Sequence, residues 1–94
     1  MGMLVGRLAK KHRLYKAATN GDDDAVEQLL AAGVSPNWRH PVWRMTPLLS
    51  AAHEHETAAG ILLVRANANV HARDRTRCTP LNHATANGMT ELVR

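Results

Sequence analysis

The stretch TPLLSAA at residues 46–52 returns 33 residues later as TPLNHAT at residues 79–85. The shared Thr-Pro-Leu predicts the start of a helix, because the threonine hydroxyl can cap the first turn and proline loses no hydrogen bond at the first helical position. Ala51 and Ala84, four residues after each proline, are small enough for a neighbouring helix to approach. A 33-residue period with this opening is typical of stacked helical repeats.

A fainter copy lies upstream, where LYKAA at residues 14–18 precedes LLSAA at residues 48–52 by 34 residues. The extra residue of this first spacing is expected in the loop Trp38–Met45. Residues that tolerate a left-handed backbone recur at equivalent places, which predicts helix ends there. They are Gly21, His55 and Gly88 between the two helices of a unit, and Gly33 and Asn67 after the second helix.

The pattern Thr-Pro-Leu-x-x-Ala, then Gly, an apolar helix and Ala-Gly-x-x-x-Asn resembles the ankyrin repeat family over roughly residues 13–94. The resemblance implies an all-α fold: an ankyrin-repeat solenoid of antiparallel helix pairs joined by hairpin-like loops. Residues 1–12 are then a basic N-terminal extension or the start of the first helix. The repeats occupy residues 13–45 and 46–78, and a truncated third repeat occupies residues 79–94.

The chain departs from the family pattern at several positions, and each departure is expected to cost about 1 kcal/mol of local stability. The family usually has histidine after Thr-Pro-Leu, glycine at the helix ends and hairpins, and a β-branched residue in the second helix. The departures are Leu49 and Asn82 for histidine, His55, Asn67, Arg44 and Arg77 for glycine, and Gly60 for the β-branched residue.

Composition sets the broad class of the protein. The 94 residues suffice for one domain, and only 3% are aromatic, so the core should be aliphatic. The single cysteine excludes an internal disulfide and suits a reducing compartment. No apolar run is long enough for a membrane span, and no secretory signal is evident. We therefore expect an intracellular chain, cytoplasmic or nuclear, without membrane contact.

The N-terminal residues 1–13 carry four cations, Arg7, Lys10, Lys11 and Arg13, and no acid. The favoured interpretation is the start of the first repeat helix, with a basic side that faces solvent. The apolar residues of this helix share another face, which comprises Leu4, Leu8, Tyr15 and Ala18. A nuclear address or contact with acidic partners is one alternative. A mitochondrial transit peptide is another, but the segment lacks serine.

Two helices are predicted near Pro47–Glu54 and Thr57–Ala66, and the aspartates Asp22, Asp23 and Asp24 should begin another, where they complement the helix dipole. The predicted core residues are Val26, Leu29, Leu30, Leu48, Ala51, Leu62 and Leu63.

No catalytic, cofactor or metal site is predicted, and the chain is not expected to be an enzyme. His53 and His55 invite a metal interpretation, but residues two apart on a helix point to nearly opposite sides. Cys78 has no activating partner that the sequence fixes. No phosphate-binding glycine loop or nucleophile elbow is present.

Two loops, residues 38–44 and 73–78, carry the residues that favour binding, and in the ankyrin architecture such loops project as fingers. The loop at residues 38–44 holds both tryptophans, and Trp and Arg are enriched at binding hot spots. Arg44 and Arg77 are 33 apart, so they should occupy equivalent places in a positive ledge that favours acidic peptides. Two alternatives stay open: a tryptophan can fold back onto the first helices, or the charges are scattered and solvated, with Asp74 paired to a neighbouring arginine.

The leading hypothesis is a protein–protein interaction module, a scaffold or adaptor fragment that binds a partner protein through its finger loops and concave helix face. The alternative is nucleic-acid binding by the basic tail and arginine ledge, which the acidic residues 22–24 weaken. An incomplete last repeat would leave Leu81, Leu92 and Val93 without a neighbour, so we expect Met89–Arg94 to fray or the chain to self-associate through that edge. The predicted partner-binding residues are Trp38, Arg39, Trp43, Arg44, Arg75 and Arg77 on the fingers, and Leu49, Ser50, His53, Asn82, His83 and Ala86 on the inner helices.

Overall fold

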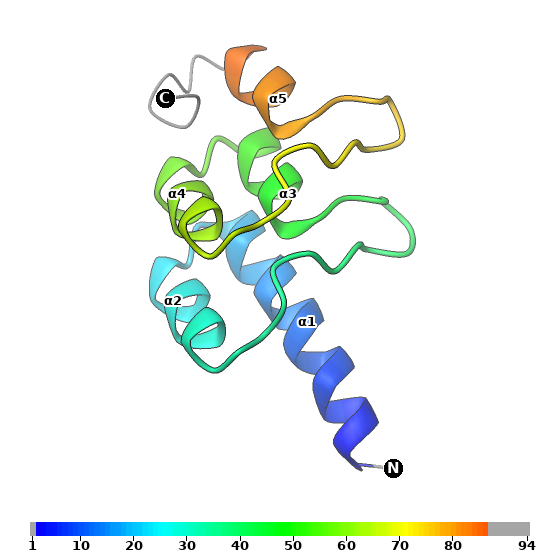
Figure 1. The fold of residues 1–94 in the computed structure, drawn as a ribbon, viewed down its shortest axis with the longest axis vertical. Helices are drawn as coiled ribbons and strands as arrows, with labels where there is room; N and C mark the ends of the chain where they lie inside the picture. The colour runs from blue at the N-terminus through cyan, green and yellow to red at the C-terminus, as the bar shows by residue number, and fades with distance from the viewer. Residues whose placement is uncertain (1, 87–94) are drawn as a thin grey trace.

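The helices form two layers in the computed structural model, which describes residues 2–86. The inner layer is α1 (Gly2–Asn20), α3 (Pro47–His53) and α5 (Pro80–Ala86), and the outer layer is α2 (Asp23–Ala31) and α4 (Thr57–Arg65). α1 contacts α3, α3 contacts α5, and α2 contacts α4, so successive helix pairs stack as equivalent units (Figure 1). Residues 2–86 contain no strand, which agrees with the predicted all-α repeat fold.

The helix starts confirm the predicted capping. The Thr46 hydroxyl accepts the backbone N–H of Leu49 at 3.2 Å, and Pro47 occupies the first helical position of α3. Asp22 caps α2 by accepting the backbone N–H of Ala25 at 3.2 Å. Each cap satisfies an N–H group that the first turn leaves without a partner inside the helix.

The left-handed positions predicted at Gly21, His55, Gly33 and Asn67 are confirmed, and the one predicted at Gly88 lies outside the described residues. Side chains make such a backbone costly, and four residues other than glycine adopt it among the described residues. The φ angles are 72° at Gly21 and 63° at His55, 87° at Gly33 and 65° at Asn67, and 58° at Arg44 and 65° at Arg77. Each pair is one helix end or hairpin place of the repeat, so the backbone conformation repeats even where glycine is missing.

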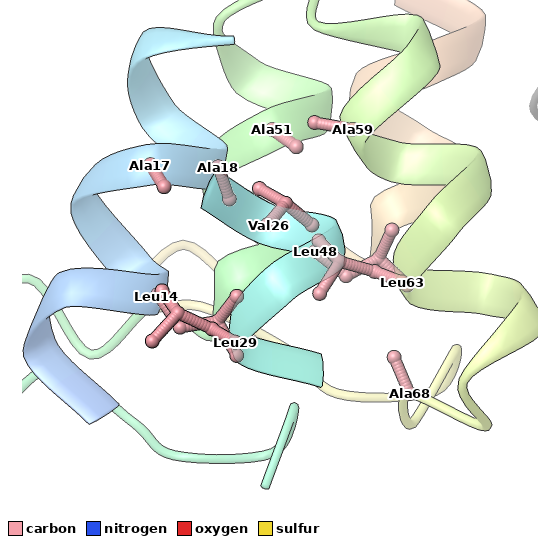
Figure 2. Close-up of a cluster of buried hydrophobic side chains, with 10 residues drawn as sticks. All are labelled: Leu14, Ala17, Ala18, Val26, Leu29, Leu48, Ala51, Ala59, Leu63 and Ala68. Atoms are coloured by element: carbon pink, nitrogen blue, oxygen red, sulfur yellow. The ribbon is translucent and has the colours of Figure 1, made fainter. Parts of the chain in front are cut away.

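The core is aliphatic and lies between the two helix layers (Figure 2). Ala51 and Ala84 are fully buried, which confirms that the alanine after Pro allows helices to approach. Leu30 and Leu62, both predicted as core, are only partly buried and pack against its edge. The cluster comprises Leu14, Ala17, Ala18, Val26, Leu29, Leu48, Ala51, Ala59, Leu63 and Ala68.

The two ends of the stack differ from its middle. Leu48 is 1% exposed, whereas Leu81, at the matching place of the next unit, is 55% exposed. Both leucines line a groove of about 380 Å³ beside α5. The predicted fraying or self-association of Met89–Arg94 lies outside the described residues. At the other end of the stack, Leu8 is 57% exposed. The apolar face that was predicted to include Leu8 is therefore buried only in the later part of α1, at Tyr15 and Ala18.

The described part of the chain holds no helix that combines the length and the apolar character needed to cross a membrane.

Candidate functional site

Two finger loops project from the same side of the inner helices (Figure 1). We call residues 37–45 the first finger and residues 71–78 the second finger. His40 N–H donates to the Met45 carbonyl at 2.8 Å, and Asp74 N–H donates to the Cys78 carbonyl at 3.0 Å. The hydrogen bond of the first finger encloses one more residue than that of the second finger, as the sequence spacing predicts. The fingers are therefore copies of one loop with different tips.

Arg39 joins the two fingers. Its guanidinium donates to the carbonyl of Arg73 at 2.6 Å and to the carbonyl of Arg44. Nearby, Asn37 Oδ1 accepts the backbone N–H of Asn69 at 2.7 Å. Arg39 was predicted to contact a partner, and this stays a prediction; its Nη1 is directed at two backbone carbonyls of this chain. Arg39 therefore holds the two neighbouring fingers together by hydrogen bonds.

The two tryptophans have different surroundings. Trp38 folds back towards α1, where its ring centroid lies 5.9 Å from that of His12, 6.0 Å from Tyr15 and 5.7 Å from His40. Trp43 is 61% exposed at the tip of the first finger. The alternative of a tryptophan that folds back thus describes Trp38, and Trp43 is the one that presents its ring to solvent.

An open groove of about 600 Å³ lies between the first finger, α1 and α3. Its walls combine aromatic rings, one lysine and several polar side chains. The lining residues are His12, Tyr15, Lys16, Thr19, Asn20, His40, Trp43, Met45, Ser50, His53 and Glu54. Of the predicted partner-binding residues, this groove brings together Trp43, Ser50 and His53.

Leu49 is 0% exposed, so the prediction that it lines the concave surface is wrong in this structure. The physical reason is that α3 contacts helices on several sides, α1, α4 and α5, which cover it. Ser50 is also buried, and its Oγ lies 2.6 Å from Thr19 Oγ1, so it ties α3 to α1 at the groove floor.

Other predicted residues of the inner helices vary in position. His53 is exposed, and its ring lies 5.3 Å from that of His83. Asn82 is exposed, but its Oδ1 accepts the N–H of Thr79 at 2.9 Å while its own N–H donates to Thr79 Oγ1 at 3.2 Å. These two reciprocal hydrogen bonds between Thr79 and Asn82 stabilise the start of α5. Ala86 is the last described residue of α5, and its surroundings lie outside the described part.

Three of the arginines predicted to bind a partner are exposed on the fingers: Arg44, Arg75 and Arg77. Arg44 and Arg77 share the left-handed hairpin place, so their backbones are equivalent. Whether they form a ledge for an acidic partner stays a prediction.

The second finger is closed by a carboxylate. Asp74 Oδ1 accepts the N–H of Thr76 at 2.9 Å and of Cys78 at 3.0 Å, and the Thr76 hydroxyl at 2.7 Å. Asp74 Oδ2 lies 2.8 Å from His83 Nε2, and the Asp74 side chain is only 5% exposed. Burial by itself would raise the pKa of Asp74, but hydrogen bonds from Thr76, His83 and the Cys78 backbone outweigh it and lower the pKa to about 2. Asp74 thus pairs with a histidine, and the alternative of an arginine partner is wrong.

The same contacts assemble a set of possible metal-ligating atoms that the sequence analysis missed. One ligand atom each of Asp74, Cys78 and His83 lies within 4.8 Å of the others. The only sequence signal is the spacing Asp-x₃-Cys-x₄-His, which spans a loop and the start of a helix. Only the return of the finger towards α5 brings these residues together.

Residues 14–94 match the ankyrin repeat family, as three copies. The chain is 40% identical over 81 residues to the potassium channel SKOR of Arabidopsis thaliana, and 35% identical over 81 residues to GORK of the same plant and to KOR2 of Oryza sativa subsp. japonica. Each match covers 86% of this chain but only 10% or 11% of the channel. Together with the stacked helix pairs, these matches show that the chain belongs to the ankyrin repeat family.

Proposed function

We propose that this chain is a protein-interaction module and that its partner binds in the groove between the first finger, α1 and α3. The groove is the observation that carries the proposal, because binding sites are concave, largely apolar surfaces with a few convergent polar groups. Trp43 supplies an exposed aromatic anchor at its rim, and tryptophan is among the residues most enriched in binding hot spots.

The charge around the groove favours an acidic partner segment with an apolar anchor. Lys16 lies in the wall, and the exposed Arg44, Arg75 and Arg77 lie on the two fingers. Such charges speed the encounter with an acidic surface and fix its orientation more than they raise the affinity. Glu54 at the groove wall would disfavour an acidic group close to it.

The similarity to potassium channels supports a module that works as part of a larger intracellular protein, as a scaffold or adaptor segment. The matched segment is about a tenth of each channel, so we propose the interaction role and no ion conduction. We also keep the proposed repeat division at residues 13–45, 46–78 and 79–94.

A displayed peptide library tests the proposal. We expect the native chain to enrich acidic peptides with an aromatic or aliphatic anchor, and Trp43→Ala to lose that enrichment. Val42→Ala is the matched control, because Val42 is the next residue, is 55% exposed and does not line the groove. Retained enrichment by Trp43→Ala, or equal loss in the control, would contradict the groove as the binding site.

Nucleic-acid binding through the basic residues of α1 and the finger arginines is the second candidate. Its support is weaker, because two backbone carbonyls already hold the Arg39 guanidinium and restrict its approach to a phosphate. A salt titration with duplex DNA and with RNA distinguishes the two proposals: affinity that falls steeply with salt favours nucleic acid.

A further inference from the structure

We propose that Asp74, Cys78 and His83 form a zinc site that links the second finger to α5. A thiolate, an imidazole and a carboxylate are the three donor types that zinc uses in proteins, whereas Mg²⁺ and Ca²⁺ prefer oxygen donors alone. The three side chains offer one ligand atom each, and all of these atoms lie within 4.8 Å of one another.

The geometry is near what zinc requires. Tetrahedral zinc, with bonds of about 2.0–2.3 Å, places its ligand atoms roughly 3.3–3.7 Å apart. Asp74 Oδ2 and His83 Nε2 are 2.8 Å apart, so they would separate slightly, and the Cys78 thiol would move towards them. Three protein ligands leave the fourth position to water. The ion would take the place of the hydrogen between the carboxylate and the imidazole.

The carboxylate is already oriented for this role. The Thr76 hydroxyl and two backbone N–H groups hold Asp74 Oδ1, which leaves Oδ2 directed at His83. Such second contacts fix the direction of a metal ligand and strengthen binding. The carboxylate carries no proton near neutral pH, so Asp74 can accept a metal ion without first losing a proton.

The first finger lacks an equivalent set. The shared backbone bonds align His40 with Asp74 and Met45 with Cys78, and Ser50 is aligned with His83 by the 33-residue period. A thioether and a buried hydroxyl that is bonded to Thr19 do not form a zinc site. We therefore expect one zinc ion per chain.

Cobalt substitution tests the site in the untagged native chain. Co²⁺ bound by a thiolate gives a sulfur-to-metal absorption band, and Cys78 is the only cysteine in the chain, so the band reports this residue directly. We expect one Co²⁺ per chain, displaced by Zn²⁺ and not by Mg²⁺, with no change of the oligomeric state in gel filtration. Absence of the band, or one ion shared by two chains, would overturn the proposal.

Substitutions locate the ligands. Cys78→Ser, and His83→Ser, which copies the serine of the preceding repeat, should each weaken zinc binding by at least about 100-fold in a calorimetric titration. His55→Asn is the control, because His55 is an exposed histidine at a left-handed place where asparagine is tolerated. Native affinity in His83→Ser, or equal loss in His55→Asn, counts against the site. Circular dichroism checks the fold of each variant, and the band of the native chain decides the matter if a variant does not fold.

Discussion

The first finger is fastened to α1 by aromatic rings, whereas the second finger is fastened to α5 by a carboxylate. His40 and Asp74 occupy the same place in the two loops. His40 Nδ1 accepts the N–H groups of Val42 and Trp43 at 3.1 and 3.2 Å, and Asp74 Oδ1 accepts those of Thr76 and Cys78. The loop thus requires an acceptor for its amide groups at this place, and either an imidazole or a carboxylate meets the requirement.

The two fingers share a backbone conformation but differ in what the second side of the acceptor residue contacts. The other side of the His40 ring faces His12, Tyr15 and Trp38 and completes the wall of the groove. The other oxygen of Asp74 faces His83 and completes the ligand set. A repeat therefore needs the same local hydrogen bonds in each finger, while the free side of the acceptor determines what each finger can bind.

The largest expected effect comes from Asp74→Ala, which leaves two backbone N–H groups and the His83 ring without their acceptor. We expect the free energy of unfolding to fall by about 3 kcal/mol, because several hydrogen bonds to a carboxylate that is only 5% exposed are lost together. Urea denaturation followed by circular dichroism measures it. Arg75→Ala, exposed on the same finger, should stay within about 0.5 kcal/mol of the native chain. Similar losses in both variants would contradict the role of the carboxylate.

Acid should loosen the second finger more than the first. Because the pKa of Asp74 is lowered from 3.8 to about 2 on folding, the unfolded chain binds the proton more readily. The carboxylate therefore stabilises the fold above a pH of about 4, and this contribution, on the order of 2 kcal/mol, is lost as the pH falls towards 2. Urea midpoints between these pH values should change less in Asp74→Asn than in the native chain. Parallel pH profiles would show that another group is responsible.

The two tryptophans sharpen the comparison within the first finger. Trp38→Ala removes the packing of the finger on α1 and should lower stability by about 2 kcal/mol, since part of a large ring is buried. Trp43→Ala should change stability by less than about 0.5 kcal/mol, because that ring is mostly exposed. Thermal unfolding of both variants tests this, and the reverse order would mean that Trp43 holds the finger.

Among the substitutions expected to change stability measurably, those of the hairpin arginines should have the smallest effects. Arg44→Gly and Arg77→Gly should each raise stability by up to about 1 kcal/mol, because glycine adopts the left-handed backbone without the steric cost of a side chain. Equal gains would show that the two hairpins are equally strained despite their different tips. A loss in either variant, measured in urea, would mean that the arginine side chain contributes contacts that exceed the backbone cost.

Local signals explain most of what could be predicted about the fold. Thr46 and Pro47 specify a helix start by their own hydrogen bonding and ring geometry, and the period of 33 transfers that start to Thr79. The left-handed places at His55 and Arg77 follow by alignment with positions that glycine usually occupies. The binding residues were harder to predict, because exposure depends on neighbours that are distant in the chain. Leu49 is buried by helices on both flanks, and Arg39 is engaged by the next finger.

The repeat, the helix caps, the left-handed turns and the extra residue of the first finger could all be predicted from the amino-acid sequence, because each depends on residues close together along the chain. Which tryptophan faces solvent, and that Asp74, Cys78 and His83 lie close together, depends on the packing of the folded chain. These outcomes depend on how a loop folds back on a helix, and no periodic pattern encodes that contact.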